Sequence, residues 1–384
     1  MKYKLLIMNK KDQKNSSSRS AKKLSFLKKS SRFFSNGLFK TIAKHSILPA
    51  TIFNSMQLTA INKEFNRFWG IEEKRHKIKK NPNFSTFTLG SPTCLWSYYF
   101  KDQESIDELY SKYALRPFRA KTSDGIKLCG MHFVSSRGHQ TNARTLIVFN
   151  GNGELYKIGS SAWLLRLLKD SPVPYNIVMF DHRETGNSTG KAHSKGLILD
   201  GEAIYDHVNI VLDVHEDQID LCGFSLGGAI ATLVKARHSA TEGALISNRS
   251  FQSLEHAVKG MFSKLANPLE NFLAKIATNI TKRSGWVLDP FDAWKSITSR
   301  KMVICHENDP IVAHSASMEK ALVEEDLIHD CKHVRLVQKN PDKNIRNHHV
   351  QPLSYYNDHK GNDVEKSVLE FLLNFDKKTL EGVS

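Results

Sequence analysis

Residues 220–228 read Asp-Leu-Cys-Gly-Phe-Ser-Leu-Gly-Gly, which places Ser225 at the centre of a GxSxG sequence. The pattern predicts a strand that ends at Cys222 and a helix from Gly228 to Arg237. A sharp turn between them holds the serine in a strained conformation, and glycine is favoured two residues to either side because a side chain would clash there. GxSxG alone recurs by chance, so its position between a strand and a helix decides the interpretation. We predict that Ser225 is a nucleophile at a helix N-terminus, whose free N–H groups face a developing oxyanion.

The surrounding sequence alternates between strand and helix patterns. Runs at 118–122 and 126–134 flank Ser123-Asp124-Gly125, which is a hairpin signal. Further strands are expected at 145–149, 176–180, 218–222, 243–247, 301–305 and 333–338, and helices at 157–169, 198–214, 226–237, 315–327 and 364–374. A hairpin followed by repeated β-α units predicts an α/β fold, with a mainly parallel twisted sheet and helices on both faces.

A turn that follows the strand at 145–149 reads Asn150-Gly151-Asn152-Gly153. Glycines let the backbone approach a bound molecule closely. In a site built on a nucleophile elbow, this loop supplies one N–H group to the oxyanion and the residue after the nucleophile supplies the other. We therefore predict the backbone N–H groups of Asn152 and Leu226 as the oxyanion hole.

Two carboxylates follow the strand at 301–305. Asp309 is the favoured acid, and Glu307 competes because it is closer to the end of the strand. A carboxylate is needed here to orient an imidazole and stabilise its charged form. The order of serine, then acid, then histidine along the chain fits this interpretation.

The base is expected on the long polar loop after the strand at 333–338, where His348 and His349 are adjacent. An imidazole can take the serine proton and return it near pH 7. His333 and His359 are less well placed. The residues themselves leave His348 and His349 as alternatives.

Over about residues 115–375 the chain resembles the α/β-hydrolase superfamily, and several segments resemble the chlamydial CHLPS-type proteins, whose relatives include Legionella proteins secreted into host cells. These segments are Phe149–Glu154, Asp181–Gly190, Gly223–Gly228, Asn248–Phe251 and His306–Val312. In that subgroup the pattern His-x-x-Pro-Leu carries the base, which here selects His349. The resemblance implies a serine hydrolase that is delivered into a host, and it implies no particular substrate.

The net charge of +16 is concentrated at the N-terminus. Residues 1–80 contain 20 Lys and Arg against 4 Asp and Glu, and the remainder is neutral. Apolar residues at 24–45 recur at roughly helical spacing among lysines, which is typical of a basic amphipathic helix on an anionic membrane. The alternative is an arm that docks on the domain. Nucleic acid is a weaker alternative partner, because the segment contains no recognised binding motif.

The rest of the chain divides into a helical lead-in at 81–114, a catalytic domain at 115–375 and a polar tail at 376–384. Residues 253–286 interrupt the alternation of strands and helices and are predicted to form a helical cap insert over the site. The five cysteines contain no CxxC pair, so we expect buried free thiols in a reducing compartment, with no metal site and no cofactor. No signal peptide or membrane-spanning helix is expected, and export by another route stays open.

The leading hypothesis is cleavage of a carboxylic ester through an acyl-enzyme, by Ser225, His349 and Asp309. A lipid ester would fit the basic arm, which favours a lipase, phospholipase or thioesterase. A peptidase or an acyltransferase could use the same three residues. The alternative from another class is a membrane-tethered binding protein that retains the fold without the chemistry. The oligomeric state stays open.

Overall fold

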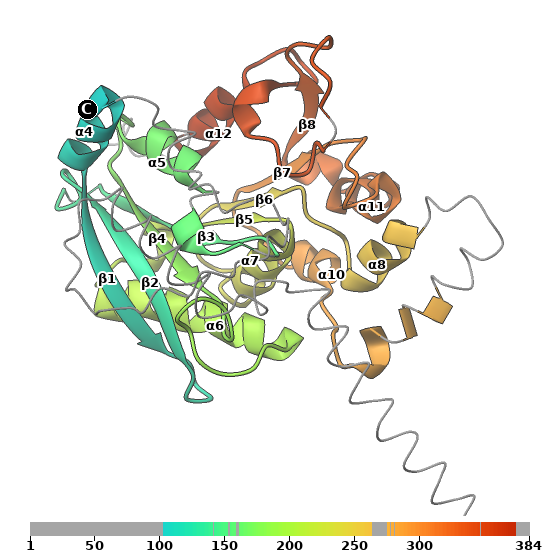
Figure 1. Cartoon of the computed structure of the whole chain (residues 1–384), viewed down its shortest axis with the longest axis horizontal. Coiled ribbons are helices and arrows are strands. Elements are labelled where there is room, and N and C mark those ends of the chain that lie inside the picture. The colour runs from blue at the N-terminus through green and yellow to red at the C-terminus, as the bar shows by residue number, and fades with distance from the viewer. Residues whose placement is uncertain are drawn as a thin grey trace, which may run out of the picture.

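The computed structural model describes residues 103–373, except for 141, 153, 159–160, 263–274, 277, 280 and 346. The predictions for residues 1–80, for most of the lead-in and for the C-terminal tail therefore lie outside the described residues. The described part is built around one nine-stranded sheet with the order β1-β2-β4-β3-β5-β6-β7-β8-β9 (Figure 1). Neighbouring strands from β4 through β3 to β8 are parallel, and β1, β2 and β9 add antiparallel edges.

The strands are β1 (Tyr113–Lys121), β2 (Lys127–Ser135), β3 (Arg144–Phe149), β4 (Tyr175–Asp181), β5 (Ile219–Phe224), β6 (Leu245–Asn248), β7 (Lys301–Cys305), β8 (Lys332–Gln338) and β9 (Tyr356–Asp358). The helices are α4 (Gln103–Lys112), α5 (Ala162–Leu168), α6 (Ser194–Asp206), α7 (Leu226–Arg237), α8 (Leu254–Phe262), α10 (Pro290–Lys295), α11 (Met318–Glu324) and α12 (Val364–Leu373). A π-helical segment, His207–Val211, continues α6.

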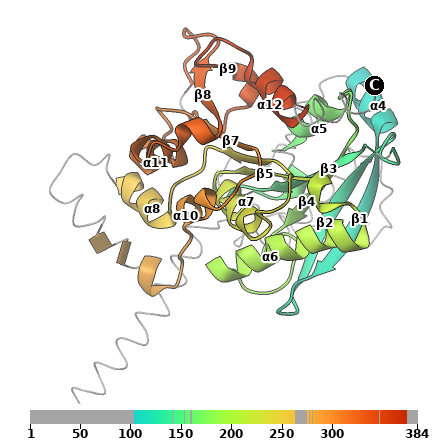
Figure 2. The ribbon, with the colours of Figure 1, turned by 180° about the vertical axis from the view of Figure 1, so that it is seen from behind.

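Side chains of the central strands alternate between two apolar cores, one on each face of the sheet. Ile147 and Phe149 of β3 pack with α6, α7, α10 and α11, whereas Leu146 and Val148 pack with α5 and α12. Figures 1 and 2 show the helices of these two groups on opposite sides of the sheet. Every residue of β3 is buried, as expected for a strand covered on both faces. The predicted α/β architecture is confirmed.

Several boundaries differ from the sequence-based prediction. The strand β1 begins at Tyr113 rather than at 118, and the helix expected at 157–169 is reduced to a short turn and α5. Helix α6 begins earlier than expected because the His193 side chain accepts a hydrogen bond from the N–H of Gly196 and caps the first turn. The short elements α10 and β9 had no sequence prediction.

The predicted insert at 253–286 begins with α8, and the described residues between 275 and 283 are helical. Helix α8 approaches the segment after β7 closely, since a Cβ on Gly260 would lie 2.9 Å from the Cβ of Ala313. The N–H of Gln252 also donates to the carbonyl of Ala316 at 2.9 Å. The insert therefore starts against the loop that contains Asp309. In the described part of the chain, no helix has the length and apolar character that crossing a bilayer requires.

Candidate active site

Ser225 occupies the turn between β5 and α7. Its backbone has φ of 53° and ψ of −119°, in the left-handed half of conformational space that residues with a side chain rarely adopt. A Cβ on Gly223 would lie 2.2 Å from the carbonyl oxygen of Gly227, and a Cβ on Gly227 would lie 2.2 Å from that of Phe149. The turn therefore requires glycine at both positions. The N–H of Ser225 donates to the carbonyl of Asn248 at 2.8 Å, which holds the turn against β6.

Three of the predicted site residues form one chain of hydrogen-bonding contacts. The Ser225 hydroxyl lies 2.9 Å from Nε2 of His349, and Nδ1 of His349 lies 2.7 Å from Oδ2 of Asp309. All three side chains are buried. The serine follows β5, the carboxylate follows β7 and the histidine follows β8, so the order along the chain is serine, acid, histidine. A nucleophile elbow on a largely parallel sheet, followed by acid and histidine in this order, characterises one fold. The chain has the α/β-hydrolase fold.

Asp309 is held as a carboxylate by the groups around it. Its Oδ1 accepts hydrogen bonds from the N–H groups of Ile311 at 2.8 Å and Val312 at 2.9 Å. Burial alone would raise the pKa of Asp309, but the hydrogen bond and charge of His349 and the two N–H donors outweigh it and hold the pKa below its ordinary value. The group is therefore charged at neutral pH and can orient the imidazole.

The alternative acid and base lie elsewhere. Nδ1 of His348 lies 3.0 Å from the Tyr356 hydroxyl, and the His348 ring stacks on His306 with the ring centroids 3.9 Å apart. Glu307 is exposed to solvent. The structure thus brings His349 and Asp309, rather than His348 and Glu307, to Ser225.

The two residues predicted to form the oxyanion hole follow the serine and β3 along the chain. Leu226 is the first residue of α7, where helix geometry provides no acceptor for the N–H. Asn152 lies in the turn after β3. Two contacts order this turn: the N–H of Gly151 donates to the Glu154 carboxylate at 2.8 Å, and the amide of Asn150 donates to the carbonyl of Phe180 at 2.9 Å. The role of Glu154 was not predicted, although its position directly after the glycine turn was a usable signal.

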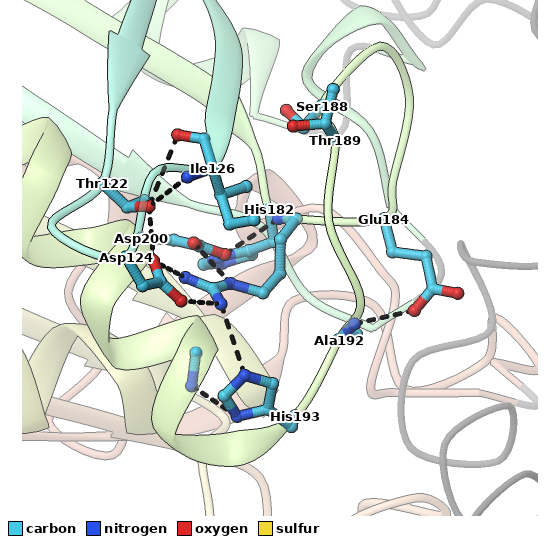
Figure 3. Close-up of polar contacts among 12 residues, drawn as sticks. Thr122, Asp124, Ile126, His182, Glu184, Ser188, Thr189, Ala192, His193 and Asp200 are labelled. Atoms are coloured by element: carbon cyan, nitrogen blue, oxygen red, sulfur yellow. Dashed lines mark hydrogen bonds and ion pairs between the residues drawn. The ribbon is translucent and has the colours of Figure 1, made fainter.

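The loop after β4 is ordered by buried charges. Asp181 accepts a hydrogen bond from the N–H of Tyr156 at 3.0 Å, and burial raises the Asp181 pKa to about 7. In the neighbouring network, Arg183 donates to Asp200 at 2.8 Å and to Asp124 at 2.7 Å. Figure 3 shows Asp124 and Asp200 side by side in this network. The hydrogen bonds that Arg183 donates to Asp124 contribute most to lowering the pKa of Asp124 to about 2. The network joins the opening hairpin to α6.

One group of potential metal ligands occurs among the described residues. The ligand atoms of Cys305, Glu319 and His333 all lie within 4.8 Å of one another. However, Arg335 donates two hydrogen bonds to Oε1 of Glu319, at 2.9 and 2.8 Å, and His333 lies 2.8 Å from the same oxygen. Burial would raise the Glu319 pKa, but the bonds from His333, Cys305 and Arg335 hold it at about 2. The carboxylate charge is thus already balanced by Arg335, and we interpret the group as an ion-pair cluster that fastens α11 to β7 and β8.

No family model matches the chain. A protein of Salmonella typhi, "Uncharacterized protein YfhR", is 32% identical over 135 residues, which are 34% of this chain and 44% of that protein. The Arabidopsis thaliana "Alpha/beta hydrolase domain-containing protein WAV2" is 27% identical over 139 residues, 35% of this chain and 42% of that protein. The chain thus matches less than half the length of these curated relatives. They give no support to the narrower resemblance to chlamydial and Legionella proteins.

Among solved structures, the Pyrococcus furiosus esterase Pf2001 aligns with a TM-score of 0.48 and 18% identity, over 70% of this chain and 93% of that one. Est1E from Butyrivibrio proteoclasticus aligns with a TM-score of 0.46 and 16% identity, over 67% of this chain and 98% of that one. With TM-scores below 0.5, these likenesses say nothing of a substrate. The assignment of the fold rests on the sheet, the elbow and the order of the site residues.

Proposed function

We propose that this α/β-hydrolase is a serine hydrolase that cleaves a carboxylic ester through an acyl-enzyme intermediate. The observation that carries the proposal is the continuous contact from Ser225 Oγ through the His349 ring to Asp309, with separations of 2.9 and 2.7 Å. A hydroxyl so paired loses its proton to the imidazole as it attacks, and the buried carboxylate stabilises the imidazolium that forms.

The reaction would proceed in two halves. Ser225 Oγ bonds to the ester carbonyl carbon while its proton moves to Nε2 of His349. The oxyanion is stabilised by the backbone N–H groups of Leu226 and Asn152. The bond between the carbonyl carbon and the alcohol oxygen then breaks, and the leaving alcohol takes the proton from Nε2. In the second half, His349 removes a proton from water, the hydroxide attacks the acyl carbon, and Ser225 departs with the proton that His349 returns.

Labelling with a fluorophosphonate, which phosphonylates activated serines, tests this proposal on the full chain. We expect the wild type to label and Ser225→Ala to remain unlabelled. His349→Ala should lose labelling, whereas its matched control, His348→Ala, should retain it because His348 contacts Tyr356 instead of Ser225. A folded wild type that stays unlabelled would overturn the proposal and favour a binding protein that retains only the fold.

A lipid ester at an anionic membrane surface is the finer proposal. It rests on the basic residues 1–80, which lie outside the described residues, and on apolar side chains of the insert. Of these, Met261 is 57% and Ile276 is 40% exposed. An acyl chain could contact such side chains, which otherwise meet water.

Vesicle binding by the full chain separates the membrane part of this proposal from the chemistry. Each lysine near an anionic surface contributes about 1 kcal/mol, so replacing three with glutamine should weaken binding to phosphatidylserine vesicles on the order of 100-fold. Suitable positions in the arm are Lys23, Lys28 and Lys29. Unchanged binding would reject a role for the arm and leave ester hydrolysis to be judged by labelling.

A further inference from the structure

Arg249 is a buried cation in a strained backbone conformation. It follows β6 directly, is 4% exposed and has φ of 50°. A buried guanidinium is costly unless its N–H groups are hydrogen bonded. Positive φ is also uncommon for a residue with a long side chain, and such strain persists only where the surrounding structure determines it. Both the burial and the strained backbone of Arg249 therefore require supporting contacts from its surroundings.

The contacts of Arg249 reach the segments that carry the three site residues. Its N–H donates to the carbonyl of Ile304 at 2.7 Å, in the strand that leads to Asp309. The carbonyl of the preceding residue, Asn248, accepts the N–H of Ser225. Its Nη1 donates to the backbone carbonyl of His349 at 2.5 Å. One residue at the end of β6 thus bonds to the strand before the acid and to the residue that forms the base.

Two aromatic rings flank the guanidinium. Its central carbon lies 5.7 Å from the ring centroid of Phe224 and 5.7 Å from that of Tyr356. Phe224, which precedes the serine, also faces the His349 ring with the centroids 4.9 Å apart. Cation–π contacts of this kind are stronger where water is excluded, so the rings fix the direction in which Arg249 points.

The Arg249 side chain ties the loop that contains His349 to the sheet, through the backbone carbonyl of His349. The N–H of His349 bonds within its own loop, to Oδ1 of Asn347 at 3.1 Å. The bond from Arg249 instead crosses 100 residues of sequence. A histidine side chain has only two rotatable bonds, which cannot restore both ring contacts once the backbone has moved. A shift of the His349 backbone therefore takes the ring away from Ser225 and Asp309.

We propose that Arg249 is a positioning residue, which fixes the backbone of His349 so that its ring meets Ser225 and Asp309 together. This inference rests on the proposed function. A displacement of about 1 Å between reacting groups lowers a rate about 100-fold. Arg249→Met should therefore lower the second-order rate constant for fluorophosphonate labelling about 100-fold. Arg249→Lys keeps the positive charge and a single donor nitrogen, and should label at about a tenth of the wild-type rate.

The controls separate positioning from stability. Tyr356→Phe keeps the ring beside Arg249 and removes the hydroxyl that contacts His348, so labelling should stay at the wild-type rate. Arg144→Met removes a guanidinium of similar burial that pairs with Asp220, at the N-terminal ends of β3 and β5. It should lower the melting temperature while the folded protein labels normally. With p-nitrophenyl acetate, Arg249→Met should lower kcat and leave KM within about twofold, because the buried Arg249 acts on the backbone of His349 and not on the substrate.

The outcomes distinguish this inference from the proposed function. If folded Arg249→Met labels at the wild-type rate, positioning is refuted and the serine hydrolase stands. If Arg249→Met does not fold, Arg249→Lys decides, and an unchanged rate refutes positioning. If the wild type itself does not label, the proposed function is refuted. Positioning is then tested by the low-field proton NMR signal of the His349–Asp309 hydrogen bond. Its loss in the Arg249 variants supports positioning, and its persistence at the same chemical shift refutes it.

Discussion

Replacing Asp309 with asparagine keeps the shape of the side chain, and the hydrogen bonds around it decide how the amide must lie. Oδ1 accepts two backbone N–H groups, those of Ile311 and Val312. The amide oxygen must take this position, because the reversed amide would direct its own N–H groups at those donors. The amide nitrogen then faces Nδ1 of His349, where Oδ2 lies 2.7 Å away in the wild type.

This orientation imposes the wrong tautomer on the imidazole. Nδ1 of His349 would accept a hydrogen bond from the amide N–H, so Nε2 would carry the ring hydrogen and present it to Ser225 in place of a lone pair. Loss of the correct tautomer in a Ser-His-Asp triad lowers the rate by about 10⁴-fold, which is about 5.4 kcal/mol in the barrier. We expect Asp309→Asn to lose this much in kcat for p-nitrophenyl acetate and a comparable factor in the rate of fluorophosphonate labelling.

The matched control is Glu307→Gln, which removes a nearby exposed carboxylate and should leave both rates unchanged. Circular dichroism at the assay temperature establishes that each variant is folded. An Asp309→Asn protein that is folded and labels within tenfold of the wild type would refute the argument, because its histidine would then still accept the serine proton.

Three further predictions test the scaffold. Gly227→Ala, whose Cβ would lie 2.2 Å from a backbone carbonyl of β3, should reduce the free energy of unfolding in urea by about 3 kcal/mol or more. The control is Gly285→Ala, which has φ of 76° and no neighbour within 4 Å of its Cβ, and should reduce it by about 1 kcal/mol. Equal losses in the two variants would refute the predicted clash at Gly227. The Glu319 pKa of about 2 lies below its ordinary 4.5, so its charged form stabilises the fold above about pH 4.5 and this contribution disappears as the pH falls towards 2. Glu319→Gln should therefore lose on the order of 2 kcal/mol at pH 7 and much less at pH 3, and the same loss at both values would exclude this origin. Arg144→Met should lose about 3–5 kcal/mol because the buried Asp220 loses its charged partner; a melting temperature equal to that of the wild type would argue against a stabilising pair.

The part of the site that could be predicted is the part encoded locally. The elbow is specified within a few residues, since Gly223 and Gly227 are required by contacts inside the turn and with the adjacent strand. Apolar runs such as 146–149 mark strands that are buried on both faces, and their succession was enough for the α/β architecture. The choice between His348 and His349 was different. Adjacent histidines on one polar loop look alike in sequence, and contacts from distant segments distinguish them.

The elements that escaped prediction depend on tertiary contacts. Strand β9 has three residues and is defined by its pairing with β8, so no periodicity could reveal it. Helix α10 has six residues with Pro290 at its start, which is too short for a helical repeat to stand out. The contact of Arg249 with His349 spans 100 residues, and nothing in either local sequence indicates the other.

The alternation of β3 between two cores has a consequence for how substitutions combine. Ile147 and Val148 are neighbours in the chain, yet they pack in different clusters on opposite faces of the sheet. Changes at these two positions should be nearly additive in free energy. Ile147 and Val178, which are partners on adjacent strands and share one cluster, should instead compensate for each other. Covariation in a lineage of such chains would then follow the faces of the sheet rather than the order of the sequence, and one core could be repacked over time while the other stayed as it was.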